Sequence, residues 1–180
     1  MAGSVVRKVF LLLSALLVMS QQPAEGQTLT GSAFAGVGAF ACCSGATSAF
    51  EVGAGLERAV TPHVSIDGEF GVAVPAGNGR IVQRSAEWTN TMDFNTGAFG
   101  SFNVFYHIDR DSRRLRPFVT GGFGCVVSCV IAAPSFGAGG DLWLRDGGGV
   151  RVEVRDQLMG EFGITHLITV RIGWVFRPRT

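Results

Sequence analysis

Several long stretches of the sequence alternate apolar and polar residues with a period of two. In the clearest stretch, 167–177, alternate positions hold Ile168, Val170, Ile172, Trp174 and Phe176. The same alternation runs through 64–74, 92–106 and 150–155, whereas 27–180 contains no convincing apolar period of 3.6 residues. A period of two places every apolar side chain on one face of a β-strand, and a helix needs the longer period. The sequence therefore predicts an all-β protein.

Turn-forming segments separate the alternating stretches and set their number. Polar or glycine-rich residues at 59–63, 107–114 and 146–148 favour tight turns. The predicted strands are 29–40, 49–58, 64–74, 92–106, 115–126, 136–145, 149–158 and 167–177. Strands of this length match tilted transmembrane strands of about 9–11 residues better than the usual soluble strand of about 5–6 residues. We expect an eight-stranded antiparallel up-and-down transmembrane β-barrel.

The composition indicates which face of each strand meets solvent. Only 16% of the residues are charged, against roughly 25% in ordinary soluble domains. Residues 27–180 contain 13 Arg, 13 Asp plus Glu and no Lys. Few charges and no lysine favour an apolar face turned toward lipid. The alternative is a soluble periplasmic β-barrel that binds an apolar ligand and turns its charged faces outward. A formal net charge of +1 lacks the basic excess of a nucleic-acid-binding protein.

The first 26 residues have the pattern of an export signal. Arg7 and Lys8 precede the apolar run 9–20, and small residues follow at Ala24 and Gly26. This order of charge, short apolar run and small residues is typical of a signal peptide, and the run is shorter than the about 20 residues of a membrane-spanning helix. We expect cleavage after Gly26 and one barrel domain over 27–180.

Charged residues of both signs occupy the polar faces of the predicted strands. They are Glu51, Asp67, Glu69, Asp141, Arg151, Glu153, Arg155 and Arg171. The interior of an eight-stranded barrel is just wide enough for side chains, and buried charges need partners. We expect a salt-bridge network that plugs the barrel, in preference to an ion-conducting pore. Aromatic residues near the strand ends are predicted to form membrane-interface girdles: Phe34, Phe40, Phe50, Phe94, Tyr106, Phe136, Trp174 and Phe176.

Four outer loops are predicted, at 41–48, 75–91, 127–135 and 159–166. The longest carries Arg80, Arg84 and Trp88, residue types that are enriched where proteins contact partners. The cysteines Cys42, Cys43, Cys125 and Cys129 fall at the outer rim, where export permits disulfides. Two bridges between the loops, or one bridge within 125–129, are both compatible with the spacing. The same spacing is poor for a tetrahedral metal site.

A lipid-modifying barrel enzyme would need a histidine, a serine and a carboxylate together at the rim. Only His166, Ser128 and Glu161 suggest such a set, and their spacing matches no lipid A deacylase or palmitoyltransferase motif. The other histidines, His63 and His107, fall in predicted inner turns. We therefore expect no enzymatic activity, cofactor or metal.

The signal peptide, the eight alternating strands, the polar outer loops and the closing segment LITVRIGWVF at 167–176 resemble the small outer-membrane β-barrel proteins of the OmpX/OmpA-barrel type. The resemblance implies an outer-membrane protein that contacts outer-membrane lipid. It also implies insertion by the barrel-assembly machinery, which reads a terminal aromatic residue. Here Phe176 is followed by Arg177, Pro178, Arg179 and Thr180. We expect a monomer with a structural or surface-contact role through its outer loops.

Overall fold

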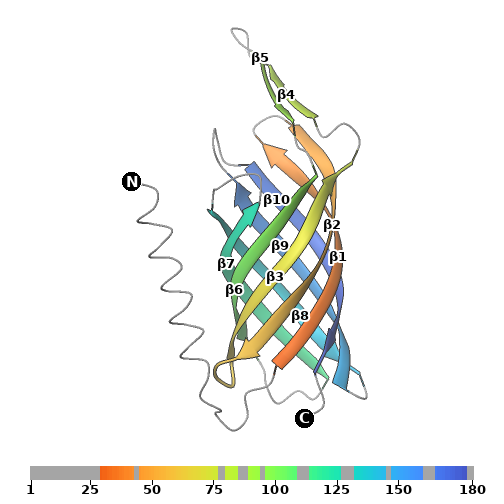
Figure 1. Ribbon diagram of the computed structural model, residues 1–180, viewed down its shortest axis with the longest axis vertical. Helices are drawn as coiled ribbons and strands as arrows, with labels where there is room; N and C mark the ends of the chain where they lie inside the picture. Colours follow the sequence, from red (N-terminus) through yellow and green to blue (C-terminus); the bar gives the residue numbers. More distant parts are fainter. Residues whose placement is uncertain are drawn as a thin grey trace, which may run out of the picture.

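Eight antiparallel strands close into a barrel, as predicted (Figure 1). The computed structural model describes residues 29–42, 45–76, 80–84, 89–93, 96–108, 114–126, 132–144, 147–159 and 165–177. The barrel strands are β1 (Leu29–Cys42), β2 (Gly45–Ala59), β3 (Val64–Pro75), β6 (Gly97–His107), β7 (Leu115–Val126), β8 (Ala132–Trp143), β9 (Gly148–Met159) and β10 (Thr165–Phe176). The predicted signal peptide, 1–26, lies outside the described residues. None of the residues that are described forms a helix long and apolar enough to cross a membrane.

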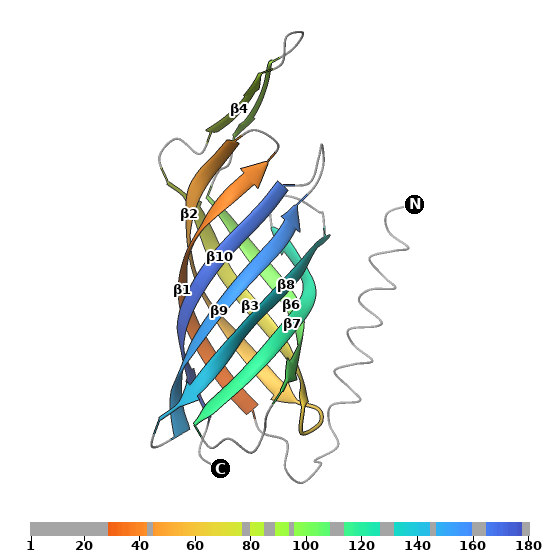
Figure 2. The same cartoon turned by 180° about the vertical axis from the view of Figure 1, so that it is seen from behind.

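The barrel has up-and-down connectivity and closes between its first and last strands. β1 pairs with β10 in an antiparallel register that runs from Gly31 opposite Phe176 to Ala41 opposite His166. Every other barrel strand pairs with its neighbours along the chain, and β3 pairs with β6. Figure 2 shows the continuous wall from behind. Because the sheet is closed, it has no edge strand with unpaired backbone groups, as a barrel in lipid requires.

The predicted strand 92–106 is confirmed from Gly97 onward as β6, but its beginning is wrong, because residues 92 and 93 lie outside the barrel in another strand. β4 (Arg80–Arg84) and β5 (Thr89–Asp93) form a separate two-stranded sheet, here called the β4–β5 hairpin. It extends beyond one end of the barrel, defined as the outer end, opposite the β2–β3 turn at the inner end (Figure 1). Met92 pairs with Ile81 in this hairpin. Local pairing satisfies the backbone outside the barrel, and the alternation of 92–106 hides the break between β5 and β6.

Two predicted outer loops are shorter than the sequence suggested. β1 extends to Cys42 and β2 begins at Gly45, so most of 41–48 belongs to the wall. β8 begins at Ala132, so residues 132–135 of the predicted loop 127–135 belong to a strand. Small residues such as Ala and Gly carry little alternating signal. The strand ends therefore could not be recognised in the sequence.

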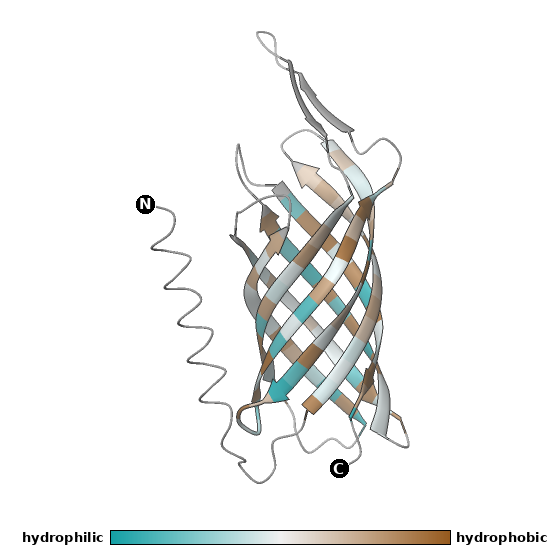
Figure 3. Cartoon of the chain, viewed as in Figure 1, coloured by the Kyte–Doolittle hydropathy of each residue, from teal (hydrophilic) through white to brown (hydrophobic). Residues whose placement is uncertain are grey.

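The apolar faces of the strands point away from the barrel axis. Ile172 and Val170 are 61% and 50% exposed on the outer wall, whereas Arg171 between them is buried. Hydrophilic and hydrophobic residues alternate along the strands in Figure 3. A soluble barrel buries its apolar face, so the alternative of a periplasmic barrel with outward charges is wrong for this structure. The apolar outer wall suits hydrocarbon.

Two aromatic residues predicted for the interface girdles instead fill the interior. Phe40 packs against Ala49 and Leu167 in a buried apolar cluster. The ring of Phe34 lies 4.6 Å from the guanidinium carbon of Arg171. Both residues share the strand face of Gly36, so the register of β1 turns them inward. Phe94 lies outside the described residues. The remaining girdle candidates are exposed on the outer wall: Phe50, Tyr106, Phe136, Trp174 and Phe176.

Replacing Gly139 with alanine is expected to lower the free energy of unfolding by about 1–3 kcal/mol, the usual range for overpacking. A Cβ at Gly139 would lie 2.2 Å from the Val152 carbonyl oxygen and 2.8 Å from Cζ of Phe118. Gly68→Ala is the matched control, because nothing lies within 4 Å of a Cβ built there. Urea unfolding of the refolded barrel measures both changes. Equal losses of stability would contradict a crowded interior.

Candidate functional site: the charged barrel interior

The central cluster of the interior holds two arginines and three glutamates. Arg171 donates from Nη1 to Glu69 at 3.1 Å and from Nη2 to Glu51 at 3.0 Å. Arg155 donates from Nη2 to Oε1 of Glu69 at 3.1 Å and from Nε to Oε1 of Glu153 at 2.8 Å. Glu69 is therefore shared by both guanidiniums. Charge-assisted bonds of this kind are stronger than neutral ones and fix the geometry of planar groups.

The inner cluster is built around Arg151. Its Nε donates to Oδ1 of Asp141 at 2.6 Å, and its Nη2 donates to Oε2 of Glu57 at 2.6 Å. The guanidinium carbon also lies 4.9 Å from the ring centre of Phe105 and 5.0 Å from that of Phe118. Two carboxylates and two aromatic faces thus hold one buried cation. This cluster occupies the inner part of the barrel.

Glu57 and His107 also belong to the inner cluster, and neither was among the predicted interior residues. Ser65 Oγ donates to Oε1 of Glu57 at 2.6 Å and lies 3.0 Å from Nε2 of His107. The same Nε2 lies 3.0 Å from Oε1 of Glu57. His107 was expected in a turn, but it ends β6 with its side chain inside. Glu57 lies an even number of residues from the buried Glu51 on β2, and His107 lies an even number from the buried Phe99 on β6. Even spacing places side chains on the same face of a strand, so this spacing could have predicted both residues.

The Ser65–His107–Glu57 arrangement does not match a hydrolytic triad. In a triad, the carboxylate and the serine contact different nitrogens of the imidazole ring. Here both contact Nε2, and the buried Nδ1 has no hydrogen-bond partner among the described residues. All three side chains are also buried. The arrangement is suited to holding Glu57 in place rather than to activating the Ser65 hydroxyl.

Asp67 lies in the interior but outside both arginine clusters. Its Oδ2 accepts a hydrogen bond from Nδ2 of Asn103 at 3.3 Å, and Ser135 in turn donates to Oδ1 of Asn103 at 3.3 Å. Its other oxygen, Oδ1, is buried without a hydrogen-bond partner in the described part of the chain. Asp67 is therefore a buried carboxylate held by neutral groups.

The structure places all eight predicted interior residues inside the barrel, each 7% exposed or less. It divides them into the central cluster, the inner cluster and Asp67. Arg116, half-buried on β7, lies at the inner end of the barrel. No group of three or more histidine, cysteine or acidic side chains that could hold a metal ion occurs among the described residues.

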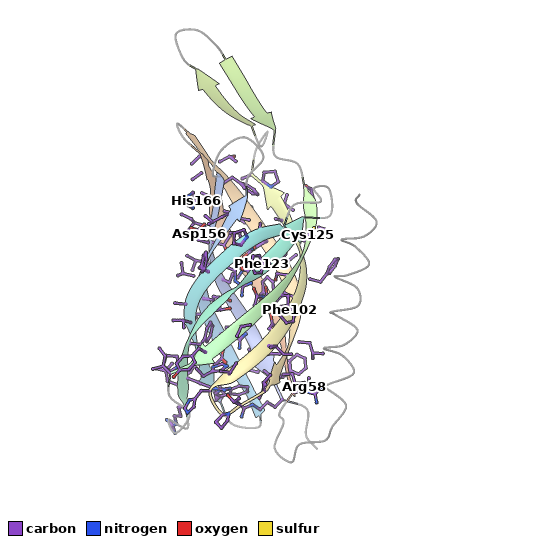
Figure 4. The ribbon with its side chains drawn as sticks, turned by 90° about the vertical axis from the view of Figure 1, so that its left-hand side faces the viewer. Arg58, Phe102, Phe123, Cys125, Asp156 and His166 are labelled. Atoms are coloured by element: carbon purple, nitrogen blue, oxygen red, sulfur yellow. The ribbon has the colours of Figure 1, made fainter. Side chains whose placement is uncertain are left out.

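Asp156 and His166 lie toward the outer end of the barrel, and Arg58 lies toward the inner end (Figure 4). Near the outer end, Nδ1 of His166 lies 2.8 Å from Oδ2 of Asp156, and both side chains are partly exposed. Ser128 and Glu161, which the enzyme hypothesis placed beside His166, lie outside the described residues. That hypothesis stays untested.

Only some of the predicted cysteine and loop residues are described. Cys125 is exposed on the outer wall (Figure 4), and Cys42 ends β1. Cys43 and Cys129 lie outside the described residues, so the disulfides stay a prediction. Arg80 and Arg84 are the first and last residues of β4, and Trp88 falls outside the described part of the chain.

Solved structures share this architecture at low sequence identity. The N-terminal β-barrel domain of Pseudomonas aeruginosa OprF aligns with a TM-score of 0.53 and 15% identity, over 84% of this chain and 100% of that one. Neisserial surface protein A (NspA) aligns with a TM-score of 0.60 and 9% identity, over 86% and 100%. The de novo designed TMB2.3 aligns with a TM-score of 0.51 and 14% identity, over 87% and 98%. No protein-family model and no curated protein sequence matches the chain.

These likenesses establish the fold. The chain has the architecture of the small eight-stranded outer-membrane β-barrels. Its apolar outer wall and charged interior agree with that class, because the lipid-facing side of such a barrel is apolar and the inside is polar. The sequence resemblance to the OmpX/OmpA-barrel type is confirmed at the level of fold.

Proposed function

We propose that this protein is a non-catalytic integral barrel of the cell outer membrane, closed to solutes and active through its outer surface. The observation that carries the proposal is the contrast between a filled interior and a projecting β4–β5 hairpin. The interior supports stability, and the hairpin supports contact with partners beyond the membrane. The protein works as a monomer inserted by the barrel-assembly machinery, with outer-membrane lipid as its surroundings.

The packing of the interior supports closure. Three groups of side chains follow one another along the axis of the barrel: the inner cluster, the central cluster and the apolar cluster of Phe40, Ala49 and Leu167. Glycines on the inward faces leave no room for even a methyl group at several positions, as at Gly38 and Gly122. An eight-stranded barrel has an interior of about the volume that side chains fill. Ion-paired side chains thus fill the space that a pore would need.

Planar-bilayer recording tests the closure. Purified refolded protein is expected to give no stable conductance steps above the background of protein-free detergent. A variant in which Arg155 and Arg171 are both replaced by alanine serves as the comparison, because it empties the central cluster. Reproducible ion-selective steps from the unmodified protein would overturn the closed-barrel proposal.

The hairpin supports the surface-contact role because it carries backbone pairing outside the barrel. Arg80 and Arg84 lie four residues apart on β4, at positions that share one face of the strand, and Arg80 pairs in register with Asp93. Arginine and tryptophan are enriched at contact hot spots, and Trp88 lies in the segment between the two strands. A two-stranded ribbon of this kind has two open edges that another protein strand can join.

Two variants test the hairpin. The first carries an epitope inserted at 85–88, and the second lacks the hairpin because a short glycine-serine turn joins residues 79 and 94. We expect the antibody to bind intact cells that carry the tagged protein. Clumping between cells that carry the unmodified protein is expected to fall after trimming, while heat-modifiable migration of the barrel stays unchanged. An epitope reached only after the cells are broken, or clumping unchanged by trimming, would overturn the proposed contact surface.

A further inference from the structure

Three arginines lie at the inner mouth of the barrel, beyond the inner cluster. Arg116 is half-buried on the inward face of β7, two residues before the buried Phe118. Arg177 directly follows the last residue of β10. Arg114 lies opposite the end of β8, because its carbonyl oxygen accepts a hydrogen bond from the Trp143 amide at 2.7 Å. Arg114, Arg116 and Arg177 are here called the mouth arginines.

Trp143 packs between these arginines at the end of β8. Its side chain shares the inward face of the strand with Asp141, and the guanidinium carbon of Arg177 lies 3.9 Å from a ring centre of Trp143. Stacking on an aromatic face fixes the plane of a guanidinium, whose donors then point outward from its edge. Arg116 lies close enough to Arg177 for their positive charges to repel each other. The fold therefore holds like charges side by side at this mouth.

Two of the mouth arginines have no carboxylate of their own. Arg114 and Arg116 make no ion pair with a described residue, and Nε of Arg116 has no hydrogen-bond partner in the described part of the chain. The carboxylates whose charges reach Arg116 are those of Glu57 and Asp141. Both are already bonded to Arg151. An added anion would therefore relieve the repulsion at the mouth.

The inner end stays positive when every acid near it is counted. The inner half of the barrel and the sequence of its connections hold eight arginines, namely Arg110, Arg113, Arg114, Arg116, Arg145, Arg151, Arg177 and Arg179. The same segments hold six acids, namely Glu57, Asp67, Asp109, Asp111, Asp141 and Asp146. Histidines are counted as neutral, and Arg58 on the outer wall is left out. The central cluster has one carboxylate in excess, which still leaves the sum positive.

We propose that the mouth arginines bind a phosphate monoester group at the inner end of the barrel. Their donors come from β7 on one side of Trp143 and from β10 on the other. A phosphate offers three strong acceptor oxygens to such donors, whereas a carboxylate offers two in one plane. Arginine and phosphate also pair through two parallel hydrogen bonds. Arg114 is exposed and Arg116 and Arg177 are half-buried, so the inner side gives access to them.

The site lies at the end of the barrel opposite the β4–β5 hairpin (Figure 1). It therefore goes beyond the proposed surface-contact role and does not depend on it. A phosphate monoester can reach the inner end on a small solute or on a lipid. The chemistry at the arginines is the same for both sources, so the experiment offers the group in both forms.

Calorimetric titration of the refolded full chain in nonionic detergent micelles tests the site. The first probe is glycerol phosphate, titrated at constant ionic strength against chloride. The second probe is phosphatidic acid, which carries the same group on a lipid in the micelle. We expect saturable binding of one or both probes. The double variant Arg114→Gln with Arg116→Gln is expected to weaken it at least about tenfold, because charge-assisted hydrogen bonds are lost.

Arg58→Gln is the matched control, because it removes the same charge at the same end of the barrel (Figure 4). Arg58 lies on the opposite face of β2 from the buried Glu57, so its loss is expected to leave the affinity unchanged. Arg116→Lys keeps the charge but not the paired hydrogen bonds, and an intermediate affinity is expected. Heat-modifiable migration checks that each variant is folded.

The outcomes separate the source of the ligand from the existence of the site. Arginine-dependent binding of glycerol phosphate would assign a solute, and binding of phosphatidic acid alone would assign a lipid. Binding of neither probe would overturn the proposal. An equal loss in Arg58→Gln and in the double variant would reduce the effect to general attraction and overturn the site. Equal affinity for succinate, a dianion with two carboxylates, would overturn the assignment to phosphate.

Discussion

Replacing Arg155 with methionine is expected to lower the free energy of unfolding by about 3–5 kcal/mol, the cost of breaking a buried ion pair from one side. Arg155 is buried and bonds both Glu69 and Glu153. Glu69 keeps a second guanidinium on Arg171, but Glu153 pairs only with Arg155 among the described residues. The substitution therefore leaves a carboxylate stranded inside the barrel. Urea unfolding in phospholipid vesicles measures the loss.

Two variants make this result specific. Arg114→Met removes an arginine exposed near the inner end and is expected to change stability by no more than about 1 kcal/mol. The double variant Arg155→Met with Glu153→Gln is expected to recover part of the loss, because it removes the stranded charge. If the single variant were as stable as the unmodified barrel, the central cluster would contribute nothing to folding.

Placing an arginine at Val170 is expected to lower the free energy of unfolding in a bilayer by about 2–4 kcal/mol, the cost of a cation at the midplane of the lipid-facing wall. Val170 is half-exposed on the outer wall, in the middle of β10. Its guanidinium would face hydrocarbon, because the neighbouring position Arg171 already points inward. Unfolding of the variant from vesicles measures the effect.

Val60→Arg is the depth control for this prediction. Val60 is 53% exposed, like Val170, but it lies in the β2–β3 turn at the inner end of the barrel. An arginine near the interface is expected to cost about 0–1 kcal/mol. Equal effects at the two positions would mean that the outer wall does not lie in lipid, and the membrane orientation of the barrel would be wrong.

The positions of strand breaks and of some aromatic residues show where sequence reasoning failed. Met92 continues the alternation of β6 in the sequence, yet it pairs with Ile81 in the hairpin. Alternation reports which face a residue occupies, and it does not report the strand partner. Phe34 and Phe40 share the inward face with Gly36, but large aromatic residues near strand ends look like girdle residues. Gly53 leaves the space that the ring of Phe34 occupies, and Phe40 fits against Ala49 and Leu167.

The sequence also could not predict which interior side chains pair with one another. Arg171 and Glu51 are 120 residues apart, and Arg155 and Glu69 are 86 apart. These pairs meet because β1 closes on β10 and because the interior is narrow enough for side chains to reach across it. Glu57 and His107 had the correct parity for the inside. Only the stagger of β2, β3 and β6 brings them together beside Ser65.

The order of residues alone determined the all-β fold, the eight-stranded barrel and the inversion of its faces, because side chains alternate strictly across an extended strand. It also determined that the eight selected charges would be buried. The tertiary structure decided which acid meets which arginine, where the β4–β5 hairpin leaves the wall, and that Asp67 is bonded by Asn103 and by none of the described arginines. These features depend on strand register and barrel closure, which set distances between residues far apart in the chain and leave no local trace in the sequence.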